Sequence, residues 1–148
     1  MATLPDRPDV RHIFRVQDAS SRSDTTPVSS ECLSCNATLP STYSNSNVST
    51  CQYARASIST HFNYYVLDCL GPTVPYSLVF SLPDNKFTKV LDTNEELKEA
   101  LELLAMPQTQ FVNYDILDEA SAPARVKLLL PPGYREEEFY TFPLVLRV

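Results

Sequence analysis

Cys51 to Cys69, CQYARASISTHFNYYVLDC, is the stretch that decides the fold of this chain. Aromatic and β-branched side chains gather towards both of its ends, and polar residues lie at 59–61 and 63 between them. The first kind of content favours short, half-buried strands, and the second favours a turn. The sequence therefore predicts a β-hairpin within 51–69, followed by an exit loop at Gly71-Pro72 and Pro75.

Further strands are predicted around this hairpin. The runs 76–82 (YSLVFSL) and 87–91 (FTKVL) follow it, separated by the turn signal Pro83-Asp84-Asn85, and 12–16 (HIFRV) precedes it after a proline-rich connection. Four short strands joined by tight turns have the size of one blade of a β-propeller. Any small antiparallel sheet fits this pattern equally well.

One helix is predicted from Asn94 to Ala105. Thr93 is placed to cap it, and Glu96 completes a Thr-x-x-Glu capping box. Its apolar residues fall at helical spacing on a single stripe: Leu97, Ala100, Leu101 and Leu104. Met106-Pro107 ends it. Beyond it, the sequence predicts strands at 110–117, 124–130 and 142–148.

Composition sets the broad class. The chain has 148 residues and 43% hydrophobic content, which predicts a folded chain. Its net charge of −6 gives no basic surface for nucleic acid, and only 2 glycines against 12 prolines exclude a glycine-rich phosphate loop. No apolar run reaches the roughly 18–20 residues that span a bilayer, and the N-terminal residues lack the apolar core of a signal peptide.

The cysteines point to an oxidising compartment. There are four, Cys32, Cys35, Cys51 and Cys69, and two N-glycosylation sequons begin at Asn36 and Asn47 among them. Either sequon can also arise by chance, because Asn, Ser and Thr are common in loops. The cysteines and sequons indicate an extracellular protein, but the N-terminal residues lack an export signal. We therefore expect a segment of a longer protein.

Cys32-Leu33-Ser34-Cys35 is open to three interpretations: a redox motif, half of a zinc site or a tight disulfide. The motif sits in a Ser/Asn-rich loop, whereas a thioredoxin-like motif begins a helix. A zinc site needs four ligands, and pairing of Cys51 with Cys69 would use up the others. His12 and His61 look isolated in the sequence. A structural disulfide is therefore favoured, and we expect no metal.

No catalytic residue can be assigned within the chain. It contains no Gly-x-Ser-x-Gly nucleophile elbow, and no Ser, His and Asp stand out as a triad. Glu136, Glu137 and Glu138 beside Arg135 are typical of a solvated turn. We expect neither catalysis by this chain alone nor a cofactor.

Taken together, these motifs resemble the dipeptidyl peptidase IV family of serine exopeptidases. The colinear matches run over about residues 7–148: RHIFRV at 11–16, CLSC at 32–35, CQY at 51–53, YYVLDCLGPTVP at 64–75, LDTNEELKEALELLAMP at 91–107 and VKLLLPPGYREEEFYTFPLVLRV at 126–148. Each motif alone is weak, and the ordered set is specific.

The resemblance implies a fold that is mostly β with one helix. Residues 1–92 would be the C-terminal part of an eight-bladed β-propeller, 93–106 a linking helix, and 107–148 the start of an α/β-hydrolase domain. In the family, the two cysteines of the Cys-x-x-Cys motif form one disulfide and the next two cysteines form another. The resemblance therefore implies the disulfides Cys32–Cys35 and Cys51–Cys69. Full-length members remove N-terminal X-Pro or X-Ala dipeptides from peptides, are secreted or type II membrane glycoproteins, and are often homodimers.

The family residues needed for activity do not fall within the part that matches this chain. The family's amine-binding glutamates lie upstream and its Ser, Asp and His lie downstream of the matching part, and its oxyanion-stabilising tyrosine would follow Val148 directly. The loops at 20–30 and 41–50 are longer than expected. A non-catalytic relative of the ion-channel accessory type and a self-contained, secreted, disulfide-bonded binding module are the alternatives.

Overall fold

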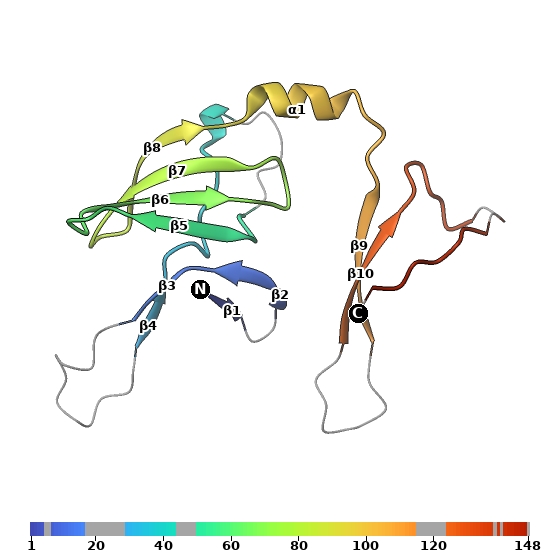
Figure 1. Ribbon diagram of the computed structural model, residues 1–148, viewed down its shortest axis with the longest axis horizontal. Helices are drawn as coiled ribbons and strands as arrows, with labels where there is room; N and C mark the ends of the chain where they lie inside the picture. Colours follow the sequence, from blue (N-terminus) through green and yellow to red (C-terminus); the bar gives the residue numbers. More distant parts are fainter. Residues whose placement is uncertain are drawn as a thin grey trace. The chain divides into compact units, whose positions relative to one another are not determined.

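The computed structural model describes residues 1–4, 7–16, 29–43, 50–114, 124–137, 139 and 141–147 (Figure 1). The described residues are mostly β-strand with one α-helix, as the sequence predicts. The chain divides into two compact units, Met1–Ala100 and Leu101–Val148.

A four-stranded antiparallel sheet is the centre of the first unit. Its strands are β5 (Ala54–Ile58), β6 (Tyr64–Cys69), β7 (Tyr76–Ser81) and β8 (Lys86–Asp92), and their order in the sheet follows the sequence. Figure 1 shows this meander in green to yellow. The predicted hairpin and the two strands after it are therefore confirmed, with shifts of one residue at some ends.

One face of this sheet forms the core of the unit. Alternate residues of β6 and β7 are buried, and they lie opposite one another: Tyr65 faces Phe80, Leu67 faces Leu78 and Cys69 faces Tyr76. The Tyr65 and Phe80 rings stack with their centroids 5.3 Å apart. Because side chains alternate between the faces of a strand, this register places three apolar pairs on one side.

The N-terminal part differs from the prediction of one strand at 12–16. His12 ends β2 (Arg7–His12), which pairs with β1 (Ala2–Leu4), and the chain then enters β3 (Phe14–Val16), which pairs with β4 (Ser30–Cys32). The proline-rich connection is thus itself part of a strand. In the described residues β2 pairs along its length with β1 alone, and an edge strand tolerates Pro8.

Helix α1 (Glu95–Glu102) is shorter than predicted and begins differently. Asn94, with φ 51°, accepts the first helical hydrogen bond from the Lys98 N–H, and the Asp92 carboxylate accepts from the Asn94 N–H (2.9 Å). The predicted Thr93 cap is therefore wrong by one residue, because the Asp92 turn sets the start. No residue of α1 is buried, so its apolar stripe has no cover that would extend the helix.

The second unit contains a regular hairpin of β9 (Gln108–Tyr114) and β10 (Ala124–Leu130), paired from Gln108↔Leu130 to Ala124↔Tyr114. The prediction for 124–130 is confirmed, and the strand predicted at 110–117 begins two residues earlier. Its last predicted residues, 115–117, lie outside the described part of the chain.

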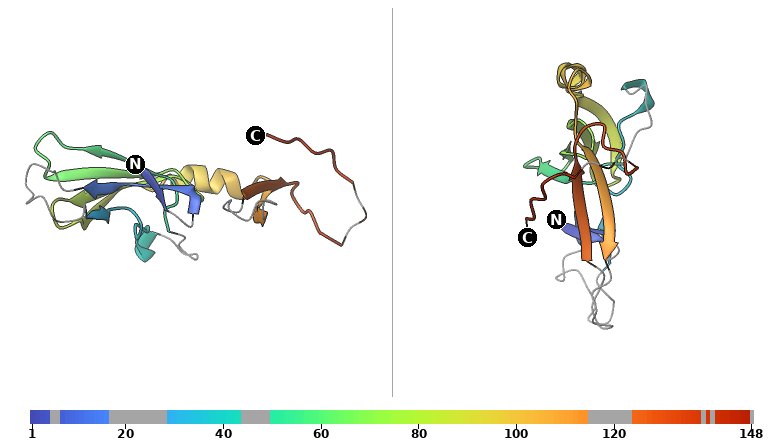
Figure 2. Two further views of the ribbon diagram at one scale, coloured as in Figure 1. Left: turned by 90° about the horizontal axis from the view of Figure 1, so that it is seen from below. Right: turned by 90° about the vertical axis from the view of Figure 1, so that its right-hand side faces the viewer.

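The strand predicted at 142–148 is wrong over its described residues. Residues 141–147 are coil, and Figure 2 shows them as extended chain. Leu144, Val145 and Leu146 are 84%, 91% and 76% exposed. A strand is defined by its hydrogen-bonded partner, and the described residues offer none here, so the apolar pattern alone does not form one.

Candidate functional site

Both cysteine pairs are disulfide-bonded, as the family resemblance implies. Cys32–Cys35 spans 5.7 Å between Cα atoms, and Cys51–Cys69 spans 5.6 Å. Cys51 precedes β5 and Cys69 ends β6, and each is 1% exposed. The second disulfide thus closes the hairpin inside the core.

Residues 29–43, the cysteine loop, lie against the buried face of the sheet. The Tyr65 hydroxyl donates to the Leu33 carbonyl (3.4 Å), which also accepts from the side-chain amide of Asn85 (3.1 Å). Leu33 and Ala37 are buried in the core. The loop is therefore fastened both to β6 and to the turn between β7 and β8.

Burial raises the pKa of Tyr65 to about 12. The ring is 2% exposed, and its hydroxyl also contacts the Asn85 side chain at 2.5 Å. An ionised phenol would lose its hydration here, which disfavours the charged form. Burial raises the pKa of Tyr76 in the same direction. Both groups are structural members of the core.

His12 is not isolated, contrary to the sequence-based expectation. Its ring nitrogen and the sulfur atoms of Cys32 and Cys35 all lie within 4.8 Å of one another. Its Nδ1 shares a hydrogen bond of 3.1 Å with the hydroxyl of Ser34, and that hydroxyl accepts from the Ile13 N–H at 3.0 Å. His12 and Ser34 are only 5% and 0% exposed. Burial, followed by the charge of Arg7, lowers the pKa of His12.

No local sequence pattern indicates this cluster. The strand pairing of β3 with β4 sets Phe14 opposite Cys32, and this brings the end of β2 to the motif. His61, in contrast, is exposed in the hairpin turn.

The two sequons differ in what can be described. Asn36 and Thr38 are exposed, and Ala37 between them is buried at 5%. The Asn36 side chain, within the cysteine loop, is therefore accessible to a glycan. Asn47 lies outside the described residues.

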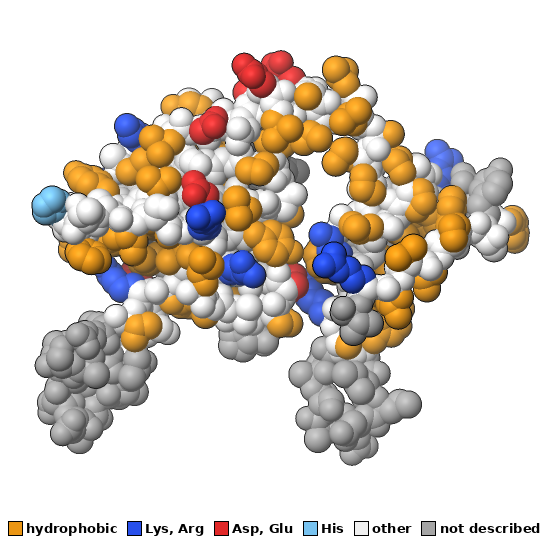
Figure 3. All heavy atoms as spheres, viewed as in Figure 1, with side chains coloured by type: hydrophobic (Ala, Val, Ile, Leu, Met, Phe, Trp, Pro, Cys, Tyr) orange, Lys and Arg blue, Asp and Glu red, His pale blue; other side chains and the backbone are white. Residues whose placement is uncertain are grey.

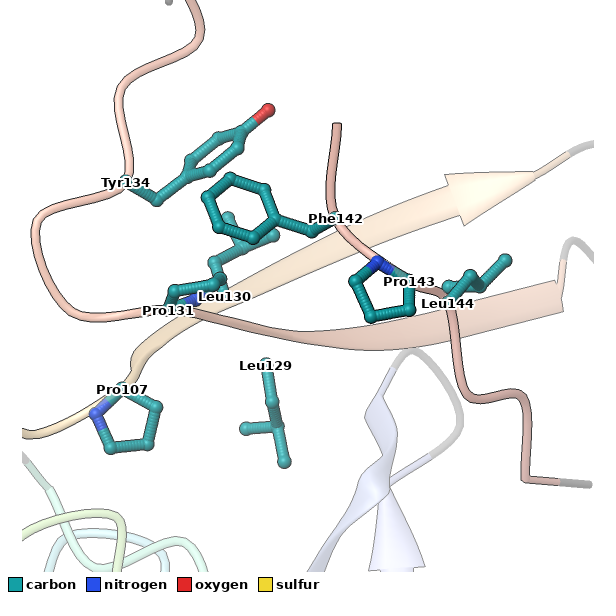
Figure 4. Close-up of a pocket in the computed structure, with 8 residues that line it drawn as sticks. All are labelled: Pro107, Leu129, Leu130, Pro131, Tyr134, Phe142, Pro143 and Leu144. Carbon is teal, nitrogen blue, oxygen red and sulfur yellow. The ribbon is translucent and has the colours of Figure 1, made fainter. Parts of the chain in front are cut away.

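The second unit contains an apolar hollow of about 530 Å³ (Figure 4). Its lining residues come from the start of β9, the end of β10 and the coil that follows: Pro107, Leu129, Leu130, Pro131, Tyr134, Phe142, Pro143 and Leu144. The Tyr134 and Phe142 rings meet at 6.1 Å between centroids. Such a hollow can receive apolar side chains.

In Figure 3, acidic side chains lie over α1 and hydrophobic side chains cover much of the β9–β10 unit. Glu136 and Glu137 are exposed, as expected for a solvated turn. No helix in the described part of the chain is both long and apolar enough to span a bilayer.

Comparison with curated proteins gives matches along nearly the whole chain. It is 30% identical to pig (Sus scrofa) dipeptidyl peptidase 4 and 29% identical to human (Homo sapiens) prolyl endopeptidase FAP, each over 141 residues and 95% of this chain. It is 33% identical over 89 residues, 60% of the chain, to dipeptidyl peptidase 4 of Trichophyton rubrum. No protein-family model matches.

The chain belongs to the dipeptidyl peptidase IV family. It spans about 16% of the length of the pig and human relatives and 11% of the fungal one. This family member has both disulfides but no Gly-x-Ser-x-Gly motif within the 148 residues.

Proposed function

We propose that this chain is a structural segment of a serine exopeptidase that removes N-terminal X-Pro and X-Ala dipeptides. The colinear match to pig dipeptidyl peptidase 4 over 95% of the chain carries this proposal. In the longer protein, a serine activated by His and Asp would perform acyl transfer on peptide substrates. Homodimerisation of that protein belongs to the same proposal.

The segment's own role is to join two domains. Residues 1–92 would contribute the last part of the β-propeller, 93–106 the linking helix and 107–148 the first strands of the α/β-hydrolase domain. The disulfide-clamped sheet supports the propeller assignment, because one four-stranded antiparallel meander is the unit of a blade. The exposed apolar residues at 144–146 suit a strand that receives its partners from the rest of a hydrolase sheet.

An extracellular location follows from the same proposal. Structural disulfides form and persist in oxidising compartments, and the exposed Asn36 is a suitable glycan acceptor. We propose that Asn36 and Asn47 both carry N-linked glycans. Loss of mass on treatment with a peptide N-glycosidase, in the protein secreted by eukaryotic cells, would support this, and an unchanged mass would count against it.

The catalytic proposal is tested with a chromogenic Gly-Pro substrate. The product of the extended transcript is expected to release Gly-Pro, and a serine-reactive phosphonate should block the release. The 148-residue chain, purified in parallel, is expected to release none, because it contains no nucleophile elbow. A folded, extended product without activity would contradict the proposal for the longer protein, and activity of the short chain would contradict the structural role.

A further inference from the structure

The cluster of His12, Cys32 and Cys35 contains the residue types that bind zinc in proteins. A Cys-x-x-Cys pair and a histidine are the usual protein ligands of zinc, and here their ligand atoms lie within 4.8 Å of one another. Ligand atoms around one tetrahedral zinc ion, with bonds of about 2.0–2.3 Å, lie roughly 3.5 Å apart. Small side-chain adjustments would therefore bring all three onto one ion, once the two sulfur atoms are no longer bonded to each other.

We propose that reduction of the Cys32–Cys35 disulfide turns this cluster into a zinc site, with His12, Cys32 and Cys35 as ligands and water in the fourth position. A dithiol reductant gives two electrons and two protons to the S–S bond and becomes a disulfide itself. Zn²⁺ then replaces the two thiol protons, which pass to solvent, and the neutral imidazole donates a lone pair. Two thiolates balance the charge of the ion.

The backbone holds the ligands in place without the disulfide. Phe14 pairs with Cys32 in the β3–β4 ladder, and the Leu33 N–H donates to the Ile13 carbonyl at 2.8 Å. These hydrogen bonds flank Cys32 and join its strand to the residues that follow His12. Opening of the S–S bond therefore leaves the histidine and the motif next to each other.

The ring of His12 is also oriented. Ser34 contacts Nδ1 and is itself fixed by the Ile13 N–H. A histidine that binds a metal through one nitrogen usually has the other held by such a partner. The hydrogen bond with Ser34 thus fixes the orientation of the His12 ring beside Cys32 and Cys35.

Accessibility distinguishes this disulfide from the other one. Cys32 and Cys35 are half-buried, whereas Cys51 and Cys69 are each 1% exposed within the core. A reductant in solution therefore reaches Cys32–Cys35 first. Cys51–Cys69 stays closed under mild conditions and serves as an internal control.

The test uses the full chain, a mild dithiol and Co²⁺ as a spectroscopic probe for Zn²⁺. After reduction we expect a thiolate-to-cobalt charge-transfer band at one Co²⁺ per chain, displaced by Zn²⁺, and no such band before reduction. His12→Asn should weaken Zn²⁺ binding at least tenfold, since Asn keeps a polar atom for Ser34 but removes the ligand nitrogen. His61→Asn, at the exposed histidine, is the matched control and should bind as the unaltered chain does.

Equal affinities of the two variants would overturn the proposal, as would a missing charge-transfer band in the reduced chain or an equal band without reduction. A readout on the unaltered chain removes any dependence on how the variants fold. Zn²⁺ should slow alkylation of Cys32 and Cys35 by iodoacetamide after mild reduction. Alkylation of these cysteines at the same rate with and without Zn²⁺ would also overturn it.

Discussion

At the scale of single residues, the core depends on side chains that face each other across β6 and β7. Leu67 and Leu78 lie directly opposite and are both 0% exposed. Leu67→Ala should lower the free energy of unfolding by about 2–5 kcal/mol, because it removes buried methyl groups and leaves a cavity. Leu70→Ala, at a leucine that is 56% exposed just after β6, should cost less than about 1 kcal/mol in the same urea titration. Equal losses would contradict the register described here.

Tyr65 makes the stability of the first unit sensitive to alkaline pH. Its pKa is raised from 10.0 to about 12, so the folded state holds the phenolic proton more tightly than the unfolded state does. The resulting stability is fully present below pH 10 and is lost as the pH rises towards 12, by about 2–3 kcal/mol. Tyr65→Phe should remove this part of the pH dependence.

The buried Tyr76 has a pKa shifted in the same direction, again by burial, and therefore contributes a pH dependence of the same sign. Tyr65→Phe should also cost about 1 kcal/mol at neutral pH, because the hydroxyl contacts Leu33 and Asn85. Urea unfolding at several pH values between neutral and 11.5 measures both effects. An identical pH profile for the variant and the unaltered chain would contradict them.

Sequence pattern predicted the strands that carry these buried residues, but not the cluster around His12. The alternation in 64–69 and 76–81 is local, and one buried face follows from it directly. The proximity of His12 to Cys32 depends on the pairing of β3 with β4, whose strands are far apart in sequence. No local period encodes that pairing, so the histidine looked isolated.

At the scale of elements, two residues compete as the N-terminal cap of α1, and their substitution distinguishes them. Thr93 is the cap that the sequence predicts, and Asn94 is the one that the structure shows, with its side-chain amide donating to the Pro75 carbonyl at 2.7 Å. Asn94→Ala should cost about 1 kcal/mol in urea unfolding, both for the lost contacts and for its φ of 51°. Thr93→Ala should cost only a few tenths. The reverse order would restore the predicted capping box.

The two disulfides should stabilise the chain unequally. Cys51–Cys69 closes 18 residues and Cys32–Cys35 closes 3, so chain entropy alone gives about 3 and about 2 kcal/mol. Burial of Cys51 and Cys69 adds to the first value. The double variant C51A/C69A should therefore unfold at lower urea than C32A/C35A. The opposite order would show that the hairpin disulfide does not clamp the core.

Elements that need a distant partner are where sequence pattern failed. The run at 142–148 is as apolar as a central strand, yet its described residues are exposed coil. The strands β9 and β10, which pair with each other, agree with the strands predicted at 110–117 and 124–130 over the residues that the structure describes. A strand in the middle of a large sheet forms its backbone hydrogen bonds with the neighbouring strands. The periodicity of its own sequence does not show whether those neighbours are present.

At the scale of the whole molecule, the chain belongs to the dipeptidyl peptidase IV family and spans about 16% of its pig and human relatives. Within that span the structure shows one blade-sized sheet, a helix and a hairpin, without a catalytic serine elbow. On the function proposed above, catalysis belongs to a longer protein, and this segment supports its fold.

Reading the coding sequence beyond Val148 tests this claim most directly. We expect an open frame with tyrosine as the next residue, followed by Gly-x-Ser-x-Gly and then by an Asp and a His that complete a triad. A stop codon directly after Val148, or an open frame in which the serine elbow is replaced, would contradict it.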